Sequence, residues 1–162
     1  MTEDDITELA RRLGRACRKR RLSIVTAESC TGGGVATAIT RVSGSAKWFE
    51  RGYVTYSNAA KRELLGVKVE TLRGHGAVSR EVAREMARGA LLHSLADVSV
   101  STTGIAGPTG ATPGKPVGTV HFAWAVRGGS VQCRKFHFKG DRAAVRLQSV
   151  AVALQGLIEL LR

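Results

Sequence analysis

The sequence has few of the side chains that build disulfide frameworks and metal centres. Its 162 residues include three cysteines, Cys17, Cys30 and Cys133, which are odd in number and scattered. This pattern indicates reduced thiols rather than a disulfide framework. The histidines stand apart from one another and from the cysteines, without the spacing of metal ligands. They are His75, His93, His121 and His137. We therefore predict no metal site.

Long apolar runs and aromatic residues are also scarce. No apolar run approaches the roughly 18–20 residues that a membrane span needs. The acidic segment 1–5 lacks the following apolar stretch of a signal peptide. With two Trp, two Tyr and four Phe, the chain has few platforms on which single-stranded bases could stack. We therefore expect no membrane partner and a cytoplasmic location.

Positive charge is abundant, with a formal net charge of +12. Seven of the eleven residues in 11–21 are Lys or Arg. Such a run can bind nucleic acid or attract a small anionic substrate. Arg11, Arg15 and Arg18 recur at helical spacing opposite an apolar stripe, so we favour a solvated helix face and expect no nucleic-acid partner.

The apolar pattern predicts one domain over residues 1–162. Hydrophobic residues make up 43% of the chain, enough for a core. Helical patterns alternate with β-rich runs, and a hairpin with a final helix follows. This order predicts an α/β fold, a three-layer α/β/α sandwich with a mixed central sheet. Expected strands are 23–27, 49–56, 97–103, 120–126 and 131–138, with a bulge near Arg134; expected helices begin at Thr2, near Gly34, and after Ser57, Ser79 and Gly140.

The first candidate site is the junction 28–34, Glu-Ser-Cys-Thr-Gly-Gly-Gly, between a buried strand and a helix. A serine here suits nucleophilic attack, because a glycine-rich turn lets backbone N–H groups approach an oxyanion. The alternative is that Ser29 or Thr31 is only a helix cap, and the pattern alone favours it. Cys30 has no histidine nearby in sequence, so we interpret it as a packed residue.

The second candidate site is the strand end and helix start around Lys61. A lysine in the first turn of a helix has its ammonium disfavoured, and desolvation would lower its pKa further. A neutral lysine can deprotonate a serine. Tyr56 could orient that lysine or relay its proton. The alternative, a solvent-facing lysine and a half-buried tyrosine, is favoured by the spacing alone.

The third and fourth candidates would bind a ligand. The segment 104–118 holds all three prolines and five glycines and follows a strand, where open α/β sheets bind ligands. It matches neither the dinucleotide fingerprint nor the P-loop, and it could be a plain surface connection. Arg142 at a helix start is a candidate phosphate contact, although a solvated first turn explains it as well.

Six motifs in order resemble the carboxy-terminal domain of the CinA (competence/damage-inducible) family. The resemblance covers about residues 9–161. The motifs are Ala27-Glu28-Ser29-Cys30-Thr31-Gly32-Gly33, Tyr56-Ser57-Asn58 with Lys61, Gly76-Ala77-Val78-Ser79, Thr103-Gly104-Ile105-Ala106-Gly107-Pro108, Lys115-Pro116-Val117-Gly118-Thr119-Val120 and Gly140-Asp141-Arg142.

The resemblance implies an amidohydrolase that converts nicotinamide mononucleotide to nicotinic acid mononucleotide and ammonia, without a cofactor. It implies a serine nucleophile, Ser29, with Lys61 and Tyr56 beside it. A homodimer is the expected oligomer, and the partner is a small anionic nucleotide. The expected substrate-binding residues are Thr31, Gly32, Gly33, Thr103, Gly104, Ala106, Gly107 and Arg142.

Two features leave alternatives open. The segment 108–114 departs from the run of glycines usual in the family, which bears on substrate fit. The amino-terminal domain of full-length CinA is expected to be absent, with its metal-dependent pyrophosphatase activity. The rival hypotheses are a non-catalytic domain that binds a pyridine nucleotide and a basic, nucleic-acid-associated protein linked to competence.

Overall fold

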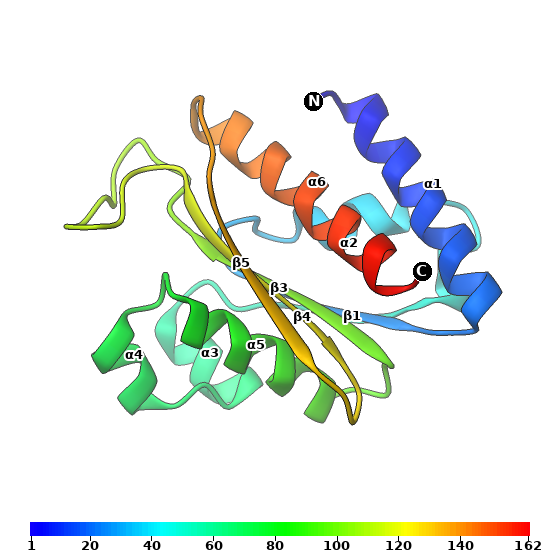
Figure 1. Cartoon of the computed structure of the whole chain (residues 1–162), viewed down its shortest axis with the longest axis horizontal. Helices are drawn as coiled ribbons and strands as arrows, with labels where there is room; N and C mark the ends of the chain where they lie inside the picture. Colours follow the sequence, from blue (N-terminus) through cyan, green and yellow to red (C-terminus); the bar gives the residue numbers. More distant parts are fainter.

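A computed structural model describes all 162 residues, and three layers are visible in it (Figure 1). Helices α1, Glu3–Arg20, α2, Gly34–Thr40, and α6, Arg142–Leu160, cover one face of a five-stranded sheet. Helices α3, Asn58–Leu65, α4, Val69–His75, and α5, Arg80–Leu92, lie on the other face. The predicted α/β/α sandwich is confirmed.

The sheet is mixed and its order places β1 inside it. Its strands are β1, Ile24–Glu28, β2, Phe49–Val54, β3, Val98–Gly104, β4, Thr119–Val126, and β5, Val131–His137, in the order β2-β1-β3-β4-β5. Strand β1 pairs in parallel with β2 and β3, whereas β3–β4 and β4–β5 are antiparallel. The carboxyl ends of β1 and β3 therefore meet at one edge of the sheet, from which residue 29 and segment 104–118 emerge.

Side-chain caps stand at four of the expected helix starts. Thr2 and Asp5 make a reciprocal capping box at the start of α1. The side chains of Ser57, Ser79 and Asp141 accept backbone N–H groups at the starts of α3, α5 and α6. Each cap satisfies a donor that the first turn leaves unpaired. Local sequence thus fixes where three of the site's supporting helices begin.

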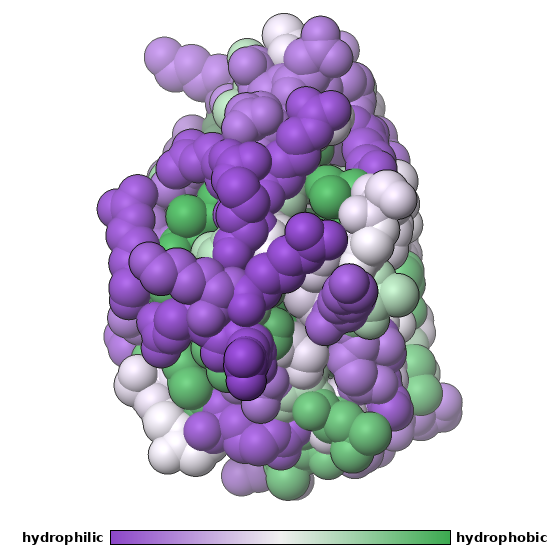
Figure 2. All heavy atoms as spheres, turned by 90° about the vertical axis from the view of Figure 1, so that its right-hand side faces the viewer, coloured by the Kyte–Doolittle hydropathy of each residue, from purple (hydrophilic) through white to green (hydrophobic).

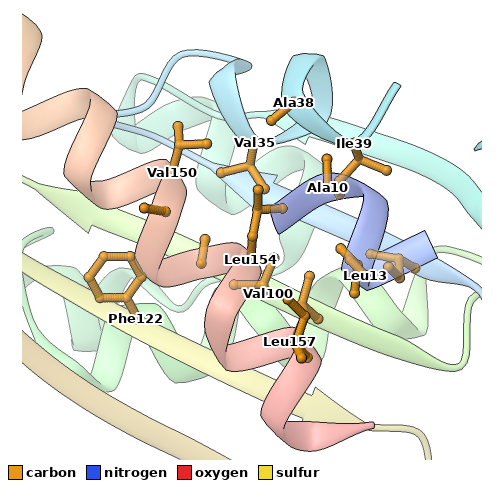
Figure 3. Close-up of a cluster of buried hydrophobic side chains, with 14 of the residues drawn as sticks. Ala10, Leu13, Val35, Ala38, Ile39, Val100, Phe122, Val150, Leu154 and Leu157 are labelled. Atoms are coloured by element: carbon orange, nitrogen blue, oxygen red, sulfur yellow. The ribbon is translucent and has the colours of Figure 1, made fainter. Parts of the chain in front are cut away.

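The larger core lies between the sheet and the layer of α1, α2 and α6 (Figure 3). Leu154 and Leu157 of α6 are fully buried among Val35, Leu13 and Val100. Burying each leucine contributes roughly 1.5–3 kcal/mol. This packing fixes α6 over the sheet, so its first two turns hold a defined position beside the carboxyl end of β1.

One sequence-based expectation is wrong, and helix α4, Val69–His75, was not foreseen. The register of β4 with β5 is unbroken, so there is no bulge near Arg134. Cys133 packs toward the α5 side and Phe136 toward the α6 side, because both faces of the sheet are covered.

By length and composition alone, α6 is a candidate membrane span, although half of its most apolar window is buried inside the structure.

The basic run 11–21 lies along α1 and ends at the right-hand edge of Figure 1. Seen from that side, the surface is largely hydrophilic (Figure 2). Arg18, Lys19 and Arg20 occupy the last turn and are exposed. Cations at a helix carboxyl end interact favourably with its dipole. This placement supports a solvated, helix-stabilising role for the run, at the end of the molecule away from residue 29.

Candidate active site

Ser29 directly follows β1, and the neighbouring strand holds it in place. Its backbone N–H donates to the carbonyl oxygen of Thr102 at 2.9 Å. The residue is 8% exposed. Gly32 and Gly33 then adopt positive φ angles of 58° and 97°, which favour glycine. Those two residues allow the tight turn that carries the chain from Ser29 into α2.

Lys61 reaches Ser29 from the opposite side of the sheet edge. Its Nζ donates to Oγ of Ser29 at 3.1 Å and to the carbonyl oxygens of Thr55 at 2.9 Å and Tyr56 at 3.1 Å. Lys61 is only 1% exposed. No carboxylate pairs with it, so burial lowers its pKa, an effect that the nearby Cys30 opposes. Burial therefore shifts Lys61 toward its neutral form, in which Nζ would donate to the two carbonyl oxygens and accept from the Ser29 hydroxyl.

Three backbone N–H groups of the turn donate to no protein acceptor: those of Cys30, Thr31 and Gly33. The N–H of Gly32 is already used, since it donates to the carbonyl oxygen of Ser29 at 2.9 Å. Unpaired donors beside a nucleophile can receive the negative charge that develops on a carbonyl oxygen. These three N–H groups are therefore candidate oxyanion donors, whereas Gly32 contributes shape rather than a donor.

Glu28 is a supporting residue that the sequence analysis missed. Its buried carboxylate accepts the hydroxyl of Thr31 at 2.5 Å and the N–H groups of Val35 at 2.8 Å and Ala36 at 3.1 Å. It therefore occupies the donors of the first turn of α2. An acid shortly before a helix start is favoured by the helix dipole, and this signal could have identified it.

The side chain of Thr31 is engaged by other protein groups. It lies buried between Glu28 and Oγ1 of Thr102, 2.8 Å away. Thr103 is likewise engaged, because its hydroxyl donates to the carbonyl oxygen of Ala77 at 2.8 Å. A Cβ on Gly104 would lie 2.7 Å from the carbonyl oxygen of Thr119. Thr31, Thr103 and Gly104 therefore support the backbone of the site, and the side chains of the two threonines are not free to bind a ligand.

Tyr56 contacts Lys61 through its carbonyl oxygen alone. Its side chain is 60% exposed, and its hydroxyl accepts from Nη2 of Arg142 at 3.1 Å. Arg142 also donates through Nη1 to the carbonyl oxygen of Gly107 at 2.9 Å. The structure therefore places the Tyr56 hydroxyl with the ligand-binding candidates.

A cavity of about 690 Å³ adjoins this arginine. Its walls come from segment 104–118 and the first two turns of α6. The lining residues include Ala106, Pro108, Val117, Arg142 and Arg146. Arg146, which the sequence analysis missed, donates to the carbonyl oxygen of Thr31 at 3.2 Å. Its spacing of four residues from Arg142 was the available signal, because such residues share one helix face.

The alternative nucleophile and metal chemistry find no support in the geometry. Burial raises the pKa of the Cys30 thiol to about 12, which disfavours the reactive thiolate. No group of three or more His, Cys, Asp or Glu side chains is placed to hold a metal ion. Ser29 and Lys61, in contact at 3.1 Å, are the candidate catalytic pair at this edge of the sheet.

Comparison with known proteins agrees with these motifs and this fold. Residues 6–161 match the model of the CinA C-terminal domain. The chain belongs to the CinA C-terminal domain family. Within this family it is 53% identical, over 97% of its length and 95% of the relative's, to the nicotinamide-nucleotide amidohydrolase PncC of Escherichia coli K12. The PncC of Pseudomonas putida is 55% identical over 97% of this chain and 98% of its own.

A solved CinA-family structure has the same fold. The competence/damage inducible protein CihA from Agrobacterium tumefaciens superposes with a TM-score of 0.95 at 48% sequence identity. The match covers 98% of this chain and 96% of that one. The CinA fold therefore covers nearly the whole chain, including the end of β1 that precedes Ser29.

Proposed function

We propose that this chain is a nicotinamide-nucleotide amidohydrolase that converts nicotinamide mononucleotide to nicotinic acid mononucleotide and ammonia, with Ser29 as nucleophile. The high identity to full-length PncC relatives supports the activity. The observation that carries the chemistry is the 3.1 Å contact between Nζ of buried Lys61 and Oγ of Ser29. A serine hydroxyl is a weak nucleophile until a base takes its proton.

In the proposed first half-reaction, Oγ of Ser29 attacks the carboxamide carbon and its proton moves to Nζ of neutral Lys61. The carbonyl oxygen becomes an oxyanion, which receives hydrogen bonds from the unpaired N–H groups of Cys30, Thr31 and Gly33. Lys61 then gives that proton to the leaving nitrogen. The C–N bond breaks, ammonia departs, and the nicotinoyl group stays esterified to Ser29.

In the second half-reaction, water attacks the ester carbon while Lys61 takes a proton from the water. The same oxyanion site stabilises the second tetrahedral intermediate. Collapse breaks the bond to Oγ, and the proton on Lys61 returns to Ser29. One amide and one water thus give one carboxylic acid and one ammonia, so the reaction balances. Preorganised backbone donors cost no rearrangement at either step.

The nucleotide part of the substrate is proposed to lie in the cavity beside Arg142. This arginine, Ala106 and Gly107 would hold the ribose and phosphate, because a guanidinium binds phosphate with strong charge-assisted hydrogen bonds. Gly33, whose N–H is unpaired, faces the amide end in this proposal. Tyr56 assists by holding Arg142 through its hydroxyl and Lys61 through its carbonyl oxygen.

We further propose a cytoplasmic homodimer that has no nucleic-acid partner. Three free thiols suit a reducing compartment, and exposed Leu92 and Leu95 offer apolar surface to a second copy. Light scattering measures the oligomer. Titration with DNA at increasing salt tests the rival role, since specific binding would saturate and weaken steeply with salt.

The deciding assay incubates the pure protein with nicotinamide mononucleotide and EDTA and measures ammonia and nicotinic acid mononucleotide. Stoichiometric release of both supports the proposal, and Ser29→Ala is the matched control. Binding of the nucleotide without release of ammonia would instead support the non-catalytic pyridine-nucleotide-binding domain. Activity that EDTA abolishes and one divalent ion restores would contradict the metal-free scheme.

A further inference from the structure

Two arginines on successive turns of α6 share the wall of the cavity. Arg142 and Arg146 are four residues apart and both line it. Like charges at this spacing on a helix repel each other. Neither guanidinium has a carboxylate within 4 Å, since the ion pairs of the structure all involve other arginines or a histidine. Asp141 also lines the cavity, but its carboxylate accepts the N–H of Ala144.

The two arginines differ in what else they hold. Arg142 donates to the carbonyl oxygen of Gly107 and to the hydroxyl of Tyr56. Arg146 is half-buried and donates to the carbonyl oxygen of Thr31, inside the nucleophile turn. Only its Nη2 is used, and the remaining N–H groups of the guanidinium are unpaired.

The turn is built closely around this guanidinium. A Cβ on Gly32 would lie 2.9 Å from Nη2 of Arg146. The carbonyl oxygen that Arg146 holds belongs to Thr31, whose own N–H is one of the unpaired donors next to Ser29. Arg146 therefore contacts the same stretch of backbone that carries the unpaired donors.

We infer that Arg146 binds the phosphate of the substrate and couples its occupancy to the nucleophile turn. This inference rests on the proposed function and names a further residue of the same site. A dianion offsets the repulsion between the two guanidiniums and fixes Arg146 between the phosphate and Thr31. Binding energy from a remote group then lowers the barrier at the reacting carbon, which raises kcat as well as affinity. Arg142, which has no contact with the turn, contributes to affinity.

The test compares nicotinamide mononucleotide with nicotinamide riboside, which lacks the phosphate. Arg146→Gln should lower kcat on the mononucleotide by about tenfold to a hundredfold, the size of one charged hydrogen bond. The loss of kcat on the riboside should be clearly smaller, because that substrate lacks the phosphate and loses only the contact of Arg146 with Thr31. Arg142→Ala should instead raise KM, and by more for the mononucleotide than for the riboside, because only the mononucleotide also loses its phosphate contact.

Added inorganic phosphate gives a second readout. In the wild-type enzyme it should increase turnover of the riboside by filling the empty anion site, and in Arg146→Gln this activation should be lost. Arg146→Lys keeps the charge but cannot hold Thr31 and phosphate in one planar fork, so it should not restore kcat. Arg11→Gln on α1 removes an exposed charge far from the cavity and is the control for general attraction. Thermal melting checks that each variant is folded.

Equal loss of kcat on both substrates, with phosphate activation intact, would show that Arg146 only supports the turn and would overturn the inference. Wild-type behaviour of Arg146→Gln would overturn it as well. If the wild-type protein releases no ammonia at all, the proposed function fails separately. Calorimetric binding of ribose 5-phosphate then decides the anion site: lost affinity in Arg146→Gln supports it, and unchanged affinity refutes it.

Discussion

Nζ of Lys61 lies 3.1 Å from Oγ of Ser29, although the two residues are 32 positions apart in the sequence. Ser29 directly follows β1, and Lys61 lies in the first turn of α3. The other two acceptors of the amine are neutral carbonyl oxygens. A lysine held in this way has no anion to stabilise its charge, which suits it to act as a base.

Removing either member of this pair should abolish most turnover. Ser29→Ala and Lys61→Ala should each lower kcat by at least about a thousandfold, and the double variant should be little worse, because residues that act as one unit are strongly non-additive. Steady-state kinetics on nicotinamide mononucleotide measure the three losses. Nucleotide binding, measured by calorimetry, should be nearly unchanged in Ser29→Ala.

Two further variants control that experiment. Lys61→Arg should not restore activity, because arginine stays protonated. Cys30→Ala should keep activity, since the buried thiol is held protonated by its raised pKa. The assignment is wrong if Ser29→Ala remains active while Cys30→Ala is dead, or if the two single losses simply multiply.

The pH dependence should report the lowered pKa of Lys61. The neutral amine is the active base, so kcat/KM should be constant above that pKa and fall tenfold per pH unit below it. Because burial lowers the pKa, the fall should begin below the pH at which an ordinary lysine titrates. A pH–rate profile checks this. An acidic limb at the usual lysine value would show that the amine is charged in the resting enzyme.

Glu28 should matter for stability more than for chemistry. Glu28→Ala leaves the N–H groups of Val35 and Ala36 and the hydroxyl of Thr31 without their acceptor. The Thr31 hydroxyl keeps Oγ1 of Thr102 as a partner. The two unpaired N–H groups cost about 1–3 kcal/mol each, so the free energy of unfolding should fall by roughly 2–6 kcal/mol. Glu28→Gln, which keeps one acceptor oxygen, should lose less. Urea denaturation measures both, and equal losses would contradict this account.

Two helical glycines should respond to alanine in opposite directions. A Cβ on Gly89 would lie 1.8 Å from the carbonyl oxygen of Leu65, the last residue of α3. Gly89→Ala should therefore displace α3, reduce stability by about 1–3 kcal/mol and lower kcat by moving Lys61. Gly74→Ala in α4 meets nothing within 4 Å and should add about 0.5–1 kcal/mol. Thermal unfolding with kinetics tests the pair, and similar effects at both positions would refute it.

Local signals carried most of the secondary structure. Ser57 and Gly66 delimit α3 as expected, so the place of Lys61 in its first turn followed from sequence. Helix α4 escaped notice because Lys68 gives it no side-chain cap and none of its residues is buried. Its short sequence therefore has neither a start signal nor an apolar stripe.

The details of the site depend on contacts that no local pattern encodes. Arg146 and Thr31 are 115 positions apart, so their hydrogen bond exists only after α6 has packed over β1. The Tyr56 hydroxyl turned to Arg142 rather than to Lys61 for the same reason. Motif spacing identified which residues gather at this edge of the sheet, and tertiary packing decided which atoms touch.

The interior position of β1 has a consequence for refolding. Ser29 is held by Thr102 of β3, which follows β2 and α5 in the chain, and by Lys61 of α3, which follows β2. Such long-range pairings form late and together, because loop closure must precede any gain from contact. Recovered catalysis should thus appear in step with the native signal of the two buried tryptophans, Trp48 and Trp124, rather than before it. The recovery of enzyme activity during refolding therefore reports when the whole sheet has formed.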